Sequence, residues 1–138
     1  MSIDNEFKHN KAYLMRYRKI HTKIDRLKNK LNRLNERYLK GVSYSSEPSS
    51  SVKKTLDDVL AQKEYLENKI DEMVSESIDI RNEIAEKLLD LDNQLEATVL
   101  DFYFLERYSL NDIADELSYS DRQIERLYVD GIMSVECR

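Results

Sequence analysis

Apolar side chains recur in alternating steps of four and three residues along the first third of the chain. Nearly every residue between them is Lys, Arg, Asn or another polar type. This is the heptad pattern of a helix with one apolar stripe, and such a helix needs a partner to cover that stripe. The positions of the stripe are Tyr13, Tyr17, Ile20, Ile24, Leu27, Leu31, Leu34 and Tyr38.

A second stretch carries a related but less regular apolar series and predicts a partner helix over about 52–95. Polar residues occupy two positions where the heptad expects apolar ones, Lys63 and Ser77. After Ile84 the pattern shifts by an inserted step of four, which locally unwinds a supercoil. The apolar members are Val52, Leu56, Val59, Leu66, Ile70, Met73, Ile80, Ile84, Leu88, Leu91 and Leu95.

A serine-rich segment, residues 41–51, separates the two helices. Gly41 is expected to end a first helix of about 5–40, and Pro48 cannot lie inside a helix. A short loop between two helices of similar length predicts an antiparallel pair, with Tyr38 near Val52. Residues 1–96 are therefore predicted to form a long antiparallel coiled-coil helical hairpin.

Composition supports an all-α fold, because two Gly and one Pro in 138 residues leave little material for turns. Charge is unevenly distributed. Residues 1–40 carry 12 Lys/Arg against 4 Asp/Glu, residues 41–96 carry 6 against 14, and residues 97–138 carry 4 against 9. A basic first helix beside an acidic second one indicates that the two pack together. The alternative is that the first helix binds nucleic acid.

Large apolar groups are dense between residues 97 and 108. They are too many for one helix face, so a third helix here should be covered on two sides and form the core of a C-terminal domain, residues 97–138. The same composition argues against a surface platform for stacking bases. The apolar residues are Val99, Leu100, Phe102, Tyr103, Phe104 and Leu105.

Residues 109–132 predict two short helices joined by a tight turn, the helix-turn-helix pattern. The helices are expected over about 110–117 and 121–130. Each follows a serine that can cap it: Ser109 stands three residues before Asp112, and Ser120 three before Gln123. Ala114 lies where the second helix should pass closely. The residues expected to face one another are Ile113, Leu117, Tyr119, Ile124 and Leu127.

The outer face of the second short helix is the predicted DNA-binding surface. Arg and Gln side chains can read guanine and adenine edges in a major groove, whereas acids can only accept from cytosine. Ser120 is partly committed to capping. The candidate DNA-binding residues are Ser120, Asp121, Arg122, Gln123, Glu125 and Arg126.

The segment from Leu110 to Ile132 resembles the C-terminal helix-turn-helix of sigma-70-type factors, region 4. The whole chain, helical first and motif last, is similar to small phage late-gene regulators of the ArpU/RinA type. The resemblance implies a DNA-binding transcriptional regulator of phage or prophage origin. The sequence departs from the sigma-like pattern at Ser118, where glycine is usual, and at Asp130-Gly131, where a basic residue and alanine are usual.

No catalytic, cofactor or metal site is predicted. Gly41 and Gly131 are isolated, so there is no glycine-rich phosphate loop, and His9 and His21 have no cysteine or acid cluster at ligand spacing. Cys137 is the only cysteine, which excludes an intramolecular disulfide. No apolar run has the length of a membrane span. We therefore expect a non-enzyme of the cytoplasm that does not bind membranes.

Three functions remain open. The first is a regulator that binds double-stranded DNA, with the hairpin supplying a homodimer contact or a contact with RNA polymerase. The second is a coiled-coil adaptor or polymerase-binding protein without sequence-specific DNA contact, which the net charge of −5 in residues 97–138 favours. The third is a phage small terminase subunit, in which the DNA-binding motif usually comes first.

Overall fold

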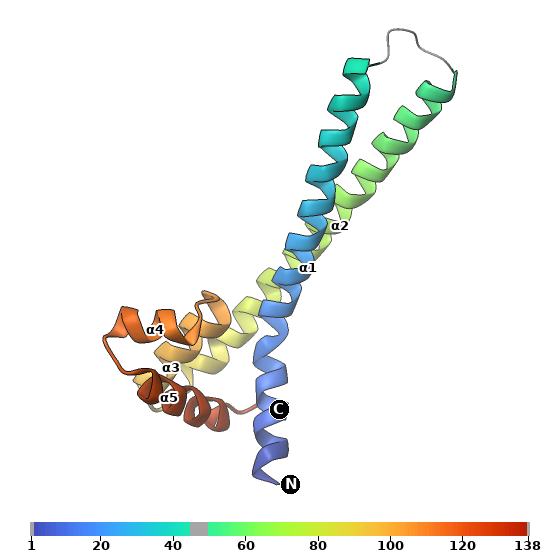
Figure 1. Cartoon of the computed structure of the whole chain (residues 1–138). Helices are drawn as coiled ribbons and strands as arrows, with labels where there is room; N and C mark the ends of the chain where they lie inside the picture. The colour runs from blue at the N-terminus through green and yellow to red at the C-terminus, as the bar shows by residue number, and fades with distance from the viewer. Residues whose placement is uncertain (1, 45–49, 138) are drawn as a thin grey trace. The chain divides into compact units, whose positions relative to one another are not determined.

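Helices make up all of the regular structure in the part of the chain that the computed structural model describes. That part is residues 2–44 and 50–137, with side chains described for residues 2–38 and 56–137. No strand occurs among these residues, so the all-α prediction is confirmed. The elements are α1 (Ile3–Tyr44), α2 (Ser50–Leu89), α3 (Gln94–Leu100), the π-helix η1 (Asp101–Leu105), α4 (Leu110–Leu117) and α5 (Asp121–Ser134) (Figure 1).

The contacts divide the chain into two units. One contains Met1–Ile20 together with Ser77–Arg138, and the other is His21–Glu76. This division differs from the boundary predicted between residues 96 and 97. The reason is that the beginning of α1 and the end of α2 pack with the C-terminal helices, so the two long helices contribute to both units.

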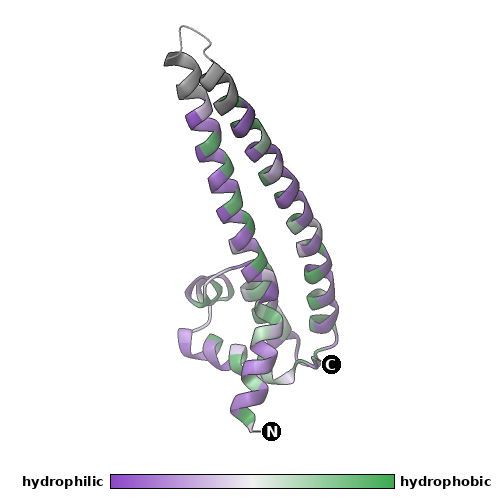
Figure 2. Ribbon diagram, turned by 90° about the vertical axis from the view of Figure 1, so that its right-hand side faces the viewer, coloured by the Kyte–Doolittle hydropathy of each residue, from purple (hydrophilic) through white to green (hydrophobic). Residues whose placement is uncertain are grey.

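In the His21–Glu76 unit, α1 and α2 run side by side in opposite directions (Figure 1). Their facing side chains are the buried ones, and hydrophobic residues alternate with hydrophilic ones along both helices (Figure 2). The buried residues here are Ile24, Leu34, Leu66 and Ile70. Pairing covers the single apolar stripe of each helix, as the periodicity required.

The apolar stripe predicted on the first helix is confirmed: all eight of its members are buried or partly buried. The described members of the second series are likewise buried or partly buried. The two polar residues that interrupt the second series are also shielded from solvent: Ser77 is 4% exposed, and Lys63 is partly buried. The side chain of Val52 is not among those that the structure describes, so the expected proximity of Val52 to Tyr38 stays a prediction.

The predicted helix ends need correction. The first helix passes through Gly41 and continues to Tyr44, so glycine does not terminate it. The second helix ends at Leu89 rather than near residue 95, because Asn93 starts a new helix. The Oδ1 of Asn93 accepts hydrogen bonds from the backbone N–H groups of residues 95 and 96, at 3.0 and 3.1 Å. Of the predicted loop 41–51, residues 45–49 lie outside the described residues.

The C-terminal helices form the core of the other unit. Of the six apolar residues predicted as core within residues 97–108, four are buried, while Phe102 and Tyr103 are partly buried. The buried apolar residues are Val99, Leu100, Phe104, Leu105, Ile113, Ala114, Ile124, Tyr128, Ile132 and Val135. From α1, Leu14 and Asn10 are also buried in this unit, although neither belongs to the predicted stripe. Their burial follows from packing against the C-terminal helices.

A π-helix explains how so many large groups are covered at once. The predicted single helix over residues 97–108 is α3 followed by η1, whose wider turn ends with the N–H of Glu106 donating to the carbonyl of Asp101 at 3.0 Å. In a π-helix each hydrogen bond joins residues five apart rather than four. Successive side chains therefore point in different directions than they would in an α-helix. Phe104 and Leu105 are thereby both buried.

Candidate nucleic-acid interface

Two serines start the two short C-terminal helices, as predicted. The Oγ of Ser109 accepts from the N–H of Asp112 at 3.1 Å, and the Oγ of Ser120 accepts from the N–H of Gln123 at 3.2 Å. At α5 the box is complete, because the Gln123 side chain also accepts from the N–H of Ser120 at 3.0 Å. These bonds satisfy N–H groups that a helix start leaves without partners.

The turn between α4 and α5 depends on Ser118. This residue has φ 59° and ψ 42°, the left-handed conformation that glycine adopts most easily. The N–H of Tyr119 then donates to the carbonyl of Ala114 at 3.0 Å and closes the end of α4. Serine therefore fills the position where a glycine would be expected, at a conformational cost of about 1–2 kcal/mol.

The packing between α4 and α5 agrees with the prediction at most positions. Ile113 and Ile124 are fully buried, and Ala114 is 3% exposed. Tyr119 is the exception, because its side chain is 39% exposed and does not belong to the core. Tyr128 is the buried aromatic residue instead, and its ring packs against Tyr103 with a tilt of 54° and 4.9 Å between the ring centroids. Burial raises the pKa of Tyr128, and the Tyr103 hydroxyl adds to this effect.

All six predicted DNA-binding residues lie at the start of α5 or on its first turns, and all six are exposed. Arg122 and Arg126 are four residues apart and therefore share one face. Val129, 45% exposed, continues that face. The arrangement presents two guanidinium groups beside an apolar contact, which can meet guanine edges and a thymine methyl group.

Gln123 is less available than the prediction assumed. Its Oε1 accepts from both the N–H and the Oγ of Ser120, each at 3.0 Å. Only its amide nitrogen remains to contact a base, so it cannot form the bidentate contact with adenine while it caps α5. Ser120 is committed in the same box, and both residues therefore support the fold as well as the surface.

Acidic side chains surround this surface. They are exposed on both short helices and would repel the phosphates of a bound duplex. The acids on α4 and α5 are Asp112, Asp115, Glu116, Asp121, Glu125 and Asp130. A duplex at this surface would therefore have to be recognised through local contacts of the arginines rather than through a broad positive field.

Two arginines that the prediction did not single out hold η1 in place. Arg18 of α1 donates to the carbonyls of Tyr103 and Tyr108, at 2.8 and 3.1 Å. Arg81 of α2 donates to the carbonyl of Leu105 at 3.0 Å, and it forms an ion pair with Glu106. No sequence signal marks these roles, because the acceptors are backbone carbonyls in and just after η1, which any residue type carries.

The basic start of α1 is also partly committed. Arg16 pairs with Glu83 of α2 at 2.6 Å, and its guanidinium lies 4.3 Å from the centre of the Tyr13 ring. This pair gives the Glu83 carboxyl a pKa below its ordinary range, mainly through the hydrogen bond from Arg16. Arg16 therefore packs with the acidic second helix, while Lys19 and Lys23 are exposed.

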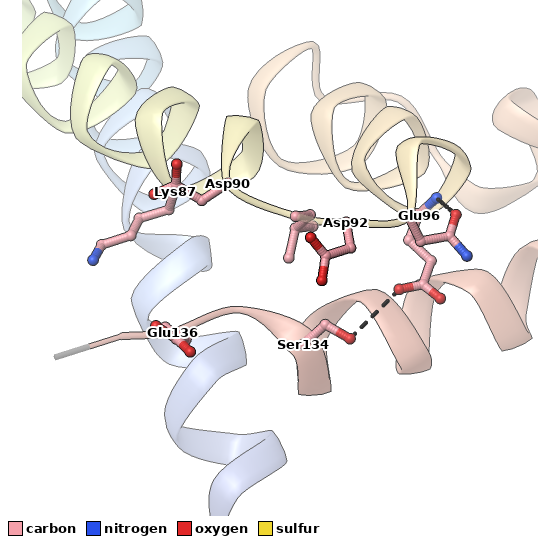
Figure 3. Close-up of a pocket in the computed structure, with 8 residues that line it drawn as sticks. Lys87, Asp90, Asp92, Glu96, Ser134 and Glu136 are labelled. Carbon is pink, nitrogen blue, oxygen red and sulfur yellow. Dashed lines mark hydrogen bonds between the residues drawn. The ribbon is translucent and has the colours of Figure 1, made fainter.

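A pocket of about 420 Å³ lies between the end of α2 and the end of α5 (Figure 3). Its wall is acidic, and Ser134 lies 3.5 Å from a Glu96 carboxylate oxygen. The charged residues that line it are Lys87, Asp90, Asp92, Glu96 and Glu136. Among residues 2–44 and 50–137, no group of three or more His, Cys, Asp or Glu side chains is placed to hold a metal ion.

No family model, no curated protein and no solved structure matches this chain. Within the residues that the structure describes, no helix is both long enough and apolar enough to cross a membrane. The case for a function therefore depends on the surface of α5 and on the two units themselves.

Proposed function

We propose that the protein is a DNA-binding transcriptional regulator, phage or prophage encoded, in which α4 and α5 form a helix-turn-helix and α5 is the recognition helix. The observation that carries this proposal is the geometry of the turn. Two capped helices meet through the left-handed Ser118, and the small, buried Ala114 lets them cross closely. A recognition helix needs this rigid support behind its exposed first turns.

Arg122 and Arg126 are the proposed reading residues. Both are exposed on one face of α5, and neither is used in the cap that holds Ser120 and Gln123. An arginine that makes a bidentate contact with a guanine discriminates against other bases by about 1–3 kcal/mol. Asp121 and Glu125 would restrict the choice of bases, since each can contact DNA only by accepting from cytosine.

The two long helices supply a second part of the proposal. We regard them as a coiled-coil hairpin, because the heptad stripe of α1 is buried or partly buried throughout its length. A hairpin of this kind offers a surface for a homodimer or for RNA polymerase. A dimer would place two recognition helices on two half-sites of a duplex.

A second candidate function is supported by the acids around α5. A surface with exposed acids on both short helices suits a basic protein partner, so the module could bind RNA polymerase without sequence-specific DNA contact. The two functions make different demands on the arginines. DNA reading needs Arg122 and Arg126, whereas a basic partner would be held by the acids.

The test is selection of bound sequences from a randomised duplex library by the full chain. Wild type should enrich one motif, and Arg122→Ala/Arg126→Ala should lose it. The matched control is Lys8→Ala/Lys28→Ala, which also removes two exposed positive charges and should enrich the same motif as wild type. If wild type enriches no motif but retains purified RNA polymerase in a pull-down, the second candidate takes its place.

A further inference from the structure

The part of α1 in the His21–Glu76 unit carries a basic stripe, defined as Lys23, Arg26, Lys30, Arg33 and Arg37. All five side chains are exposed. Their spacing of three and four residues places them within an arc of about 80° on the helix, because each residue turns the helix by about 100°. Lys28 of the same helix lies on the opposite side. The five positive charges therefore lie on one face of α1 and are not spread evenly around the helix.

Three of the five residues of this stripe form a wall of a groove between α1 and α2. The groove has a volume of about 410 Å³. From α1 it is lined by Lys30, Arg33 and Arg37 together with two leucines, and from α2 by Gln62, Tyr65 and Leu66. Three positive charges and no negative charge line it. Its floor is apolar, since Leu34 and Leu66 are 8% and 6% exposed.

No acid of the described part of α2 is paired with the cations of this groove. Within the described residues, no ion pair joins Lys30, Arg33 or Arg37 to an acid. Glu67 and Glu72 are paired along their own helix, with Lys63 at 4.0 Å and Lys69 at 3.6 Å. The predicted packing of the basic first helix against the acidic second one therefore does not pair these three cations with acids.

Tyr65 adds an aromatic surface at the same place. Its side chain is 64% exposed, so the face of the ring is accessible to a ligand in the groove. It lines the groove beside the three cations. Cations that follow a sugar-phosphate backbone, with a ring on which a base can stack, form the combination that binds single-stranded nucleic acid.

We propose that this groove binds single-stranded nucleic acid, with Lys30, Arg33 and Arg37 contacting phosphates and Tyr65 stacking on a base. Duplex DNA fits less well, because its bases are stacked on each other and cannot reach Tyr65. An acidic helix would satisfy the charges but leaves the exposed ring unexplained. The inference is independent of the reading role proposed for α5.

The test is binding of the full chain to fluorescein-labelled twenty-nucleotide oligo-dT, followed by fluorescence anisotropy at several salt concentrations. Wild type should bind. Lys30→Gln/Arg33→Gln should weaken binding and reduce the slope of log K against log salt by about 1.4, since each phosphate contact on a single strand contributes about 0.7. Lys8→Gln/Lys28→Gln removes the same charge elsewhere and should leave affinity and slope within twofold of wild type.

Tyr65 separates stacking from charge. Tyr65→Phe should retain the affinity of wild type, whereas Tyr65→Leu, still apolar, should weaken binding about fivefold or more. Circular dichroism should show unchanged helicity for each variant, since all these positions are exposed. An oligo-rU arm tests whether the groove distinguishes RNA from DNA, and Arg126→Ala should not change oligo-dT binding.

Three results would overturn the proposal. The first is absence of oligo-dT binding by wild type at low salt. The second is equal loss in the groove variant and its control, which would assign binding to overall charge. The third is a Tyr65→Leu variant with unchanged affinity, together with one of two observations. Either a twenty-base-pair duplex binds more tightly than oligo-dT, or poly-glutamate competes for the groove as well as unlabelled oligo-dT does. That result would mean that the groove holds duplex phosphates or an acidic chain instead.

Discussion

The side-chain amide of Asn10 in α1 donates a hydrogen bond to the backbone carbonyl of Ile132 in α5, at 2.8 Å. The same nitrogen donates to the carbonyl of Val135 at 3.0 Å. Asn10 is 4% exposed, so both bonds are shielded from water. They supply donors to carbonyls at the C-terminal end of α5, where helical partners run out; the Ile132 carbonyl also accepts from the N–H of Val135 at 3.3 Å. One polar side chain near the start of the chain therefore fixes the end of the candidate recognition helix.

We expect Asn10→Ala to lower the free energy of unfolding by about 1–3 kcal/mol, because two buried carbonyls lose a donor. Asn10→Asp should cost more at neutral pH, since a carboxylate would face two carbonyl oxygens. Part of that loss should return at low pH, where a protonated carboxyl can donate one bond. Urea unfolding followed by circular dichroism measures all three effects. The control, Asn5→Asp, changes an exposed side chain of the same helix and should have little effect.

The sequence predicted the buried stripe and the caps because each depends on local spacing. Seam positions such as Ile24 repeat with the helix period, and Ser120 with Gln123 forms a capping box within four residues. Asn10 could not be found in this way. Its partners lie more than 120 residues away in the chain, and a polar residue outside the stripe gives no signal of burial.

The π-helix was missed for a related physical reason. A π-turn is unfavourable on its own and persists where tertiary contacts support it, here carbonyl contacts from Arg18 and Arg81. The six residues predicted to form the surface of α5 were expected to be exposed, and all six are exposed in the structure. Gln123 occupies a position that serves both as the third residue of a cap and as an exposed reading position; the structure shows its side-chain oxygen in the cap, and its reading role stays a prediction.

Gly131 provides a second prediction, because it lies on α5 directly against Leu100 and Glu96 of α3. A Cβ atom at this position would be 3.1 Å from both Cγ and Cδ1 of Leu100, and 3.3 Å from Cβ of Glu96. Alanine gains up to about 1 kcal/mol of helix propensity over glycine, but crowding a packed core costs about 1–3 kcal/mol. Leu100 is fully buried and has little room to move. Gly131→Ala should therefore lower the melting temperature.

A double-mutant cycle with Leu100→Ala checks the cause of that loss. Leu100→Ala alone should cost about 2–5 kcal/mol by leaving a cavity. Once it is present, Gly131→Ala should cost less or become stabilising, since the crowded atoms are gone. Asp130→Ala, at the exposed neighbour, serves as a control. Strictly additive effects would show that Leu100 is not what limits the size of residue 131.

The Glu96 carboxyl predicts a pH effect on stability. Burial, and next the negative charge of Asp130, raise the pKa of Glu96 above its ordinary value of 4.5. The folded chain therefore holds this proton more tightly than the unfolded chain. The resulting stability is fully present below pH 4.5 and is lost as the pH rises through the raised pKa. Glu96→Gln, neutral throughout, should melt higher than wild type at pH 7 and show no such advantage near pH 4.

Thermal melts of both proteins across this pH range measure the difference. Glu136→Gln removes an exposed carboxyl from the same pocket and serves as the control. A constant offset between Glu96→Gln and wild type at every pH would assign the effect to packing rather than to the proton.

The last prediction separates folding from reading at Gln123. Gln123→Ala should lower stability by about 0.5–2 kcal/mol, because the box with Ser120 is lost. Gln123→Glu keeps an oxygen that can accept from the N–H of Ser120, so its melting temperature should stay near wild type. The new carboxylate cannot donate to a base and repels phosphate. On a duplex selected by wild type, Gln123→Glu should therefore bind more weakly, whereas Arg126→Ala should relax specificity by about 1–3 kcal/mol at one position. Anisotropy titrations measure the affinity for DNA, and thermal melts measure stability. If Gln123→Glu binds the duplex as tightly as wild type, Gln123 acts in the cap alone.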